Sequence, residues 1–192
     1  LAQGVLPVAL GQATKTINFI TNKEKTYSFT IRWGEETETD DAEGEVTKTS
    51  LVRPSEIQIE NMIEKYFLGY INQKPPKYSA VKINGRRAYD LAREKKSFTT
   101  NSKKVKIHNF KILSNVDENH TSFKVKCNSG TYVRSLARDL ARKLGTFGHA
   151  LNIKREQDNF FKIANSIELD TILNCNTVSF NKNILPLEFV LQ

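Results

Sequence analysis

The sequence is poor in the features that disulfide-rich, zinc-binding and membrane proteins require. Its two cysteines, Cys127 and Cys175, belong to no C-x-x-C pair, and its three histidines are scattered. We therefore expect neither a disulfide framework nor a metal site. No apolar run approaches the roughly 18 residues of a membrane span, and the start lacks the charged-then-apolar layout of a signal peptide. These absences favour a cytoplasmic protein with no membrane partner.

The chain also lacks an initiating methionine, and no helix cap or other start signal stands near Leu1. We expect a part N-terminal to Leu1 to be missing. A chain of 192 residues with 39% hydrophobic residues is long enough to build one sizeable core. No internal repeat or low-complexity linker divides it, so we expect one mixed α+β domain over residues 1–192.

The net charge of +8 comes from one short segment of the chain. Ten basic residues lie between positions 82 and 111 against Asp90 and Glu94, whereas the rest of the chain holds 19 basic and 19 acidic residues. Such a local positive surface points to a polyanion. Nucleic acid is favoured over membrane because no amphipathic face with Trp or Phe accompanies the charge. A solvated basic face without a partner is the alternative.

Periodicity and turn signals predict the secondary structure. Helices are expected from Ala13, from Pro54 to Tyr66, after the Asn84-Gly85 turn, and at residues 169–173. The polar, acidic stretch that begins at Gly34 predicts a loop. The inner face of the Pro54 helix is expected to be Ile57, Ile59, Met62, Ile63 and Tyr66. Strands are expected at residues 5–10, 26–33, 78–83, 103–113, 121–127, 150–155 and 160–163.

The clearest helical pattern covers residues 129–144. Apolar residues recur along it at helical spacing and predict one buried stripe. Thr131 is a candidate N-cap, which places Tyr132 and Arg134 in the first turn. A guanidinium held there by a rigid element is suited to an anion. The alternative is an ordinary amphipathic helix with a surface arginine.

Three stretches of the chain resemble the bacterial tRNA pseudouridine-55 synthases of the TruB type, and they occur in the same order as in that family. They are residues 1–15 (LAQGVLPVALGQATK), 76–93 (PKYSAVKINGRRAYDLAR) and 129–134 (SGTYVR), and the acidic loop at 37–44 (TETDDAEG) matches as well. The resemblance covers nearly the whole chain and implies a mainly antiparallel sheet flanked by helices. The implied activity is isomerisation of the uridine at position 55, in the T arm of tRNA, by base flipping, without metal or cofactor.

The resemblance also implies roles for two catalytic residues. The family's nucleophile is an aspartate immediately before the residue that matches Leu1, so the chain by itself is expected to be inactive. Arg134 matches the arginine that pairs with this aspartate, and such a cation keeps a carboxylate ionised and oriented. Tyr27 matches the tyrosine that stacks on the extruded uracil and is proposed to help move the C5 proton. A packing role for Tyr27 is the alternative.

Further matches are expected to contact the substrate. Tyr132 matches a second substrate-contacting tyrosine. Ile153 stands where the family has a leucine that lines the uracil pocket, a change that conserves volume. Lys154 and Arg155 match an Arg-Arg pair expected to contact phosphates, and lysine keeps the charge but loses the bidentate grip. The following residues 156–163 (EQDNFFKI) lack the Thr and Gly commonly found in the family.

The acidic loop and the basic segment supply the last expected contacts. Asp41 matches the acidic residue of the family's loop, with an Asx turn that only orders the loop as the alternative. Lys82 lies in a basic insertion at about residues 74–104, which in the family is mobile, clasps the T arm and would order on RNA binding. The family's C-terminal RNA-binding module is expected to be absent or very reduced. The expected partner is tRNA, and the expected state is a monomer.

Two other functions stay open from the residues alone. A non-catalytic RNA-binding or tRNA-folding module would use the same scaffold. A membrane-surface binder would use the basic segment, although little apolar surface accompanies that charge.

Overall fold

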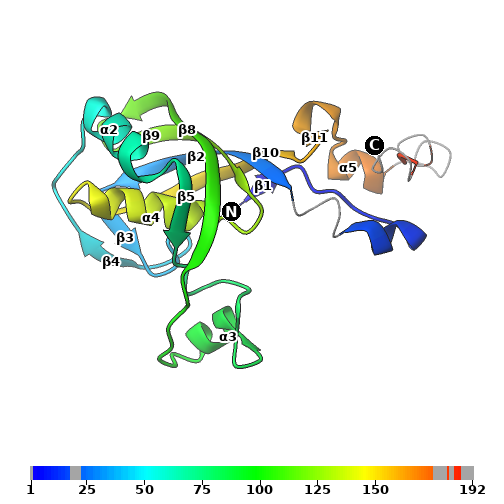
Figure 1. Ribbon diagram of the computed structural model, residues 1–192, viewed down its shortest axis with the longest axis horizontal. Helices are drawn as coiled ribbons and strands as arrows, with labels where there is room; N and C mark the ends of the chain where they lie inside the picture. The colour runs from blue at the N-terminus through cyan, green and yellow to red at the C-terminus, as the bar shows by residue number, and fades with distance from the viewer. Residues whose placement is uncertain (1, 18–22, 175–180, 182–183, 187–192) are drawn as a thin grey trace.

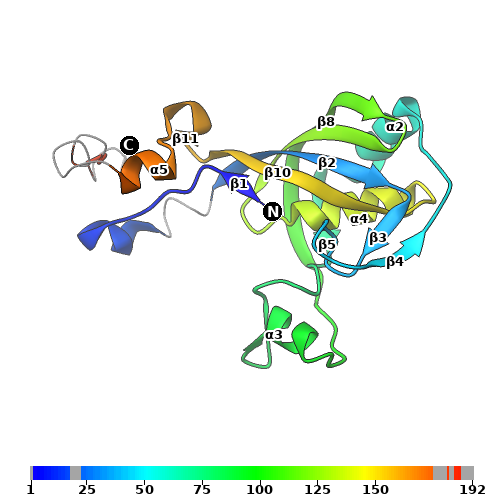
Figure 2. The ribbon, with the colours of Figure 1, turned by 180° about the vertical axis from the view of Figure 1, so that it is seen from behind.

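A twisted β-sheet forms the centre of the computed structural model, and helices α2 and α4 cover one of its faces (Figure 1 and Figure 2). The structure describes residues 2–17, 23–174, 181 and 184–186. The strand order is β1-β10-β2-β9-β8-β5, with β11 paired to β10, and among the described strands only β1 and β10 run parallel. This mixed, mainly antiparallel sheet with flanking helices confirms the predicted fold class. The strands are β1 (Gln3–Gly4), β2 (Glu24–Trp33), β5 (Gly69–Gln73), β8 (Lys103–Asp117), β9 (His120–Asn128), β10 (Gly148–Asp158) and β11 (Phe161–Lys162).

Two small ribbons and the helices complete the described elements. The insertion between β5 and β8 carries one ribbon and α3, and it extends away from the sheet at the lower edge of Figure 1. The ribbons pair β3 (Glu35–Thr37) with β4 (Val46–Thr49), and β6 (Lys82–Ile83) with β7 (Arg86–Arg87). The helices are η1 (Gly11–Thr16), α2 (Glu56–Tyr66), α3 (Ala88–Arg93), α4 (Val133–Lys143), η2 (Ile163–Asn165) and α5 (Leu169–Leu173).

The core lies between the sheet and the two covering helices. β2 alternates as predicted, and its Phe29, Ile31 and Trp33 are at most 2% exposed. Phe29 lies opposite Phe123 of β9, and the two rings stack with centroids 5.6 Å apart. Phe110 of β8 joins the same cluster, with its ring centroid 5.5 Å from that of Phe123. Fully burying such a side chain stabilises a fold by about 1.5–3 kcal/mol, so this aromatic cluster anchors the sheet to the helices.

Helix α4 confirms the predicted apolar stripe. Its buried members lie in the same core cluster as the β2 and β9 aromatic residues, and Leu144 is half-buried against that cluster. The stripe fixes the rotation of α4 about its axis, so the residues between its members face away from the sheet. The stripe consists of Val133, Leu136, Ala137, Leu140, Ala141 and Leu144.

The inner face of α2 differs from the prediction at two positions. The helix begins after Ser55, which forms a capping box with Gln58. Ile59 and Ile63 are buried as expected, but Ile57 is 70% exposed. Two residues correspond to about 200° of helical rotation, which places Ile57 opposite Ile59.

The end of α2 gives the second difference. Tyr66 is 42% exposed, whereas Phe67, the residue after the helix, is 2% exposed. The Phe67 ring meets the Phe110 ring edge-on, with centroids 6.2 Å apart. Phe67 therefore takes the core position that the helical pattern had assigned to Tyr66.

The predicted strand at residues 5–10 is wrong. Only Gln3–Gly4 pairs in the sheet, and after the buried Val5 the side chains of Leu6 and Val8 are 71% and 73% exposed. Pro7 has no N–H to donate to a neighbouring strand, which explains why pairing stops there. The helix expected from Ala13 is the short 3-10 helix η1.

Two other predictions change in extent, and one strand was missed. The expected loop after Gly34 contains the β3–β4 ribbon, and the expected strand at 78–83 is reduced to β6. Strand β5 was not predicted, and its only partner among the described strands is β8, about thirty residues further along the chain. The Asn84-Gly85 turn is confirmed, with φ of +49° and +83°, as a type I′ turn requires.

Gly4 permits the close approach of β1 to β10 and gives a stability prediction. Its φ is +117°, and a Cβ at this position would lie 2.2 Å from the backbone oxygen of Arg155. We expect Gly4→Ala to destabilise the protein by about 1–3 kcal/mol or more, through backbone strain and loss of the β1–β10 pairing. Gly85→Ala is the control, because φ is +83° there but no atom lies within 4 Å of the added Cβ. Urea unfolding that gave equal losses for both variants would contradict the close-approach explanation.

Candidate functional site

A cavity of about 610 Å³ lies at the N-terminal end of α4. Four residues predicted from the sequence line it, namely Asp41, Tyr132, Arg134 and Ile153. Ala2, from the start of the described chain, lines it too. The remaining lining residues are Thr39, Glu43, Tyr78, Ser79, Ala80, Tyr89 and Arg93. The cavity thus joins the acidic loop, the basic insertion and the first turn of α4.

Arg134 connects these three segments. Its Nη1 donates to the Thr39 carbonyl oxygen and to Asp41 Oδ2, each at 2.9 Å, and its Nη2 donates to the Tyr78 carbonyl oxygen at 2.9 Å. The side chain keeps 23% of its surface exposed. A guanidinium carries five N–H donors, so these bonds within the described residues leave two of them unused. Arg134 is therefore a fixed cation at the cavity wall with donors to spare.

The structure shows the Asx turn at Asp41 and places the same side chain at the cavity, while contact with a substrate stays a prediction. Its Oδ1 accepts a hydrogen bond from Thr39 Oγ1 at 2.5 Å and from the Glu43 backbone N–H at 3.0 Å, which is an Asx turn. Its other oxygen binds Arg134 and its side chain lines the cavity. Asp41 therefore orders the loop and forms part of the cavity wall.

Two further arginines of α4 hold the same loop and its ribbon. Arg138 Nη1 binds Asp40 Oδ2 at 2.8 Å, and Arg142 Nε binds Glu36 Oε2 at 2.7 Å. Together with Arg134 they recur every four residues, so they form one row along the helix beside the apolar stripe. We call Arg134, Arg138 and Arg142 the arginine row.

The arginine row meets carboxylates in different environments. Burial raises the pKa of the Asp40 carboxyl, although the Arg138 guanidinium opposes the shift. Burial would also raise the pKa of Glu36, but hydrogen bonds from Arg142 and Lys48 outweigh it and lower that pKa. Arg138 additionally donates to the Lys74 carbonyl oxygen at 2.8 Å. The row thus fixes the acidic loop and the start of the insertion to one rigid helix.

Gln73 positions Tyr132 at the start of α4, which corrects the predicted cap. Thr131 donates to the Asn128 carbonyl oxygen at 2.8 Å instead of capping the helix, and Tyr132 is the N-cap residue without a side-chain cap. The buried Gln73 amide accepts from the Tyr132 N–H at 2.7 Å and donates to the Tyr132 carbonyl oxygen at 3.0 Å. The helix therefore begins one residue later than predicted, and Gln73, from a distant strand, holds its N-cap residue while the Thr131 hydroxyl bonds to the preceding turn.

Tyr27 does not line the cavity. It lies on β2, half-buried against the core and opposite Arg155 of β10. Burial raises the pKa of the Tyr27 hydroxyl, and a hydrogen bond with the Arg155 side chain only partly offsets this. The hydroxyl is therefore neutral at physiological pH and available as a donor.

The three predicted basic contacts also lie outside the cavity lining. Lys82 is exposed on the β6–β7 ribbon, and Lys154 is half-exposed on β10. Arg155 holds the chain start, because its Nε donates to the Val5 carbonyl oxygen at 2.6 Å and its Nη1 lies 3.5 Å from Asp158. Phosphate binding by these residues stays a prediction.

The insertion contributes lining residues that the sequence reasoning missed. Tyr78 donates to Glu38 Oε1 at 2.9 Å, and the Arg93 guanidinium lies over the Tyr89 ring at 5.5 Å. Ser79 is 4% exposed, and its hydroxyl has no hydrogen-bond partner within the described part of the chain. Residues 78–80 (YSA) belong to the predicted basic insertion, but only the folded insertion brings Tyr78 against Arg134.

The described residues lack the features of a membrane span and of a metal site. They contain no helix that is both long and apolar enough to cross a membrane. They also contain no group of three or more His, Cys, Asp or Glu side chains placed to hold a metal ion.

Comparison with curated proteins gives matches along the whole chain. A protein from Caulobacter vibrioides named tRNA pseudouridine synthase B is 43% identical over 193 residues, covering 100% of this chain and 62% of that protein. The protein of the same name from Brucella ovis is 49% identical over 155 residues, covering 81% of this chain and 48% of that protein. The chain therefore spans less than two thirds of the length of these relatives.

Solved structures and a family model complete the comparison. A crystal structure of a Cbf5-Nop10-Gar1 complex contains a chain with a TM-score of 0.72 at 23% identity, covering 98% of this chain and 49% of that one. An H/ACA RNP bound to a substrate RNA containing 2′-deoxyuridine gives 0.69 at 20% identity, covering 98% and 48%. These likenesses concern the fold. The model described as TruB family pseudouridylate synthase (N terminal domain) matches residues 1–133, and the chain belongs to that family.

Proposed function

We propose that the protein containing this chain converts uridine to pseudouridine in the T arm of tRNA. Family membership and the names of the curated relatives support this activity and substrate. The observation that carries the proposal is the cavity at the start of α4, where Arg134 offers unused N–H donors beside Asp41. Uridine and pseudouridine are isomers, so the reaction needs no oxidant, reductant or group donor. The C1′–N1 and C5–H bonds break, and a C1′–C5 bond and an N1–H bond form in their place.

Arg134 orients the catalytic carboxylate in this proposal. The family resemblance assigns the nucleophile to an aspartate before Leu1, and Ala2 lines the same cavity as Arg134. A charge-assisted hydrogen bond from the guanidinium keeps a carboxylate ionised and fixes its direction. The bonds from Arg134 to the Thr39 and Tyr78 carbonyl oxygens hold the guanidinium still while it does so. Pre-organisation of this kind is what makes a fixed charge effective in catalysis.

The flipped base enters the cavity in the proposed mechanism. Unstacking a nucleotide costs a few kcal/mol, part of which an aromatic or apolar lining recovers. Tyr132 and Ile153 supply such surfaces in the cavity. Tyr27 is proposed to approach from β2 with a neutral hydroxyl that hydrogen-bonds to the base or assists transfer of the C5 proton.

The insertion and the remaining basic residues are proposed to hold the tRNA. Lys82 lies on the exposed ribbon of a lobe that carries α3 and extends away from the sheet (Figure 1). Lys154 and Arg155 lie on β10, and strands β2 and β9 lie between β10 and β8, where the insertion rejoins the sheet. We propose residues 1–192 as part of the catalytic domain, with residues 74–104 as an RNA-clasping insertion, acting as a monomer in the cytoplasm.

The activity assay with Tyr27→Phe tests this proposal. We expect the full-length protein to form pseudouridine in a T-arm stem-loop, and Tyr27→Phe to lower kcat by about 10²-fold. RNA affinity should stay near the wild-type value, because phenylalanine keeps the ring. Tyr66→Phe is the matched control, since Tyr66 lies at the exposed end of α2 and should leave kcat unchanged. Tight binding by the wild type without any pseudouridine would favour the non-catalytic RNA-binding module instead.

A further inference from the structure

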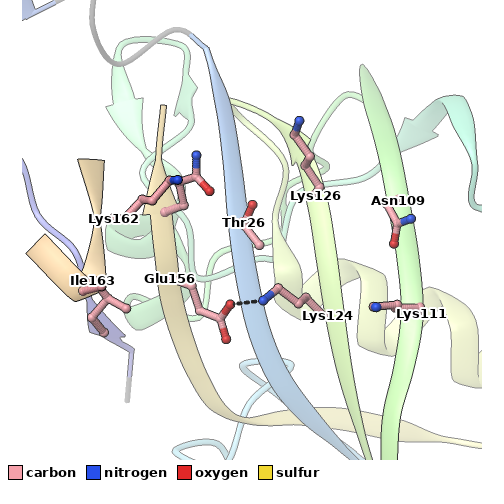
Figure 3. Close-up of a pocket in the computed structure, with 10 residues that line it drawn as sticks. Thr26, Asn109, Lys111, Lys124, Lys126, Glu156, Lys162 and Ile163 are labelled. Atoms are coloured by element: carbon pink, nitrogen blue, oxygen red, sulfur yellow. Dashed lines mark ion pairs between the residues drawn. The ribbon is translucent and has the colours of Figure 1, made fainter. Parts of the chain in front are cut away.

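The face of the sheet turned away from α2 and α4 carries a row of lysines. In β8 and β9, buried residues such as Val105, Phe123 and Val125 alternate with lysines that point outward. Figure 3 shows three of these lysines standing on this face, with α4 behind the sheet. We call the set the lysine face, and it consists of Lys104, Lys106, Lys111, Lys124 and Lys126.

The strand pairing brings together charges that are distant in the sequence. Lys111 of β8 lies directly opposite Lys124 of β9, and Lys126 lies opposite Asn109. Like charges that face each other across two strands destabilise a sheet. Glu156 pairs with Lys124, and Glu24 pairs with Lys126 at 2.6 Å, but no ion pair of Lys111 is found in the described chain. The lysine face therefore keeps an excess of positive charge that the fold does not neutralise.

A groove of about 590 Å³ runs over part of this face. Lys111, Lys124 and Lys126 line it on one side, and Lys162 of β11 lines it on the other (Figure 3). Four ammonium groups around an open groove are suited to a chain of phosphates, because each lysine acts as a point charge without demanding one geometry. Glu156 is the one carboxylate among the residues that line the groove.

An exposed tyrosine extends the lysine face at the sheet edge. Tyr70 of β5 is 66% exposed, and the Nζ atoms of Lys104 and Lys106 lie 4.8 Å and 5.5 Å from the centre of its ring. In proteins that bind single-stranded nucleic acids, bases stack on aromatic rings and neighbouring cations contact the phosphate backbone. A membrane surface would require an extensive exposed apolar patch, whereas the groove is lined by four lysines and, among aliphatic residues, by Ile163 and Ala164.

We propose that the lysine face binds the phosphate backbone of the substrate RNA at a position separate from the cavity. The cavity is formed by the first turn of α4 and the β3–β4 loop, whereas the lysine face lies on the other side of the sheet. An RNA whose T arm occupies the cavity must therefore reach the lysine face with another part. The inference rests on the proposed function only for the identity of the RNA.

The test compares two RNAs with matched double variants of the full-length protein. Lys111→Gln/Lys124→Gln should weaken binding of intact tRNA about tenfold and reduce the slope of log K against log salt by about one per lysine. Binding of an isolated T-arm stem-loop should not change. The control is Lys65→Gln/Lys143→Gln, which removes two charges over the Tyr66 ring on the helix side of the sheet. We expect the control to leave both affinities at the wild-type value.

The outcomes separate the inference from the proposed function. The lysine face would be overturned as a separate RNA surface if Lys111→Gln/Lys124→Gln bound tRNA with wild-type affinity. It would also be overturned if the variant lost equal affinity for intact tRNA and for the T-arm stem-loop. Unchanged tRNA binding together with weakened binding of an acidic polypeptide would assign the face to a protein partner and overturn it too. Selective loss of tRNA binding would support it, even if the wild type formed no pseudouridine. Urea unfolding verifies that both double variants are folded.

Discussion

Replacing Arg134 with alanine in the full-length protein is expected to lower kcat for pseudouridine formation by about 10²–10³-fold, which is the cost of removing one pre-organised charged donor. The affinity for tRNA should change much less. Arg134 is 23% exposed at the wall of the cavity, and its bonds to Asp41 and two carbonyl oxygens aim it there. Pseudouridine formation under single-turnover conditions, with RNA binding measured separately, checks the prediction.

Two variants make the Arg134 experiment specific. Arg134→Lys keeps the charge but loses the fork that reaches Asp41, Thr39 and Tyr78 together, so it should recover only part of the activity. Arg142→Ala removes an arginine of the same row that is 47% exposed and does not line the cavity, so its kcat should stay near wild type. If Arg134→Ala lost RNA binding in proportion to kcat, a purely structural role for this arginine would be the better explanation.

Replacing Arg138 with methionine is expected to destabilise the protein by about 3–5 kcal/mol, because it leaves a buried carboxylate without its partner. The Arg138 and Asp40 side chains are 8% and 9% exposed. Arg138 also binds Asp139 and the Lys74 carbonyl oxygen, each at 2.8 Å. Urea unfolding of the full-length protein measures the loss. The double variant Asp40→Asn/Arg138→Met should regain part of the stability, since the unpaired charge is then absent.

Arg142→Met provides the comparison for Arg138→Met. Its side chain is 47% exposed, so the pair that it forms with Glu36 is screened by water and is worth about 0–1 kcal/mol. If Arg142→Met and Arg138→Met lowered the free energy of unfolding by similar amounts, burial of the ion pair would not determine the cost of removing its arginine. A small loss for Arg138→Met would remove the physical basis for the proposed anchoring of the loop.

The features predicted from the sequence are those that depend on local periodicity. The α4 stripe, the alternation of β2 and the Asn84-Gly85 turn each follow from neighbouring residues, and all three are confirmed. Phe67 shows where this reasoning stops, because a residue one position beyond the helix reached the core in place of Tyr66. Periodicity does not predict how the chain turns after the last helical residue.

The parts that were missed depend on residues far apart in the sequence. Arg134 binds Asp41 across 93 positions, and Gln73 positions Tyr132 across 59. Arginines at every fourth position of one helix and a separate acidic loop were both visible in the sequence, and their opposite charges are the signal that would have joined them. Lys111 ends the basic segment at positions 82–111 and Lys124 lies outside it. The sheet nevertheless places the two lysines side by side.

The location of pseudouridine in an intact tRNA tests the central claim most directly. A transcript without modifications is incubated with the full-length protein, and each pseudouridine is mapped to its nucleotide. We predict one new pseudouridine, at position 55 in the T arm. Pseudouridine at another position only, or none under conditions where the protein binds the tRNA, would contradict the proposed function.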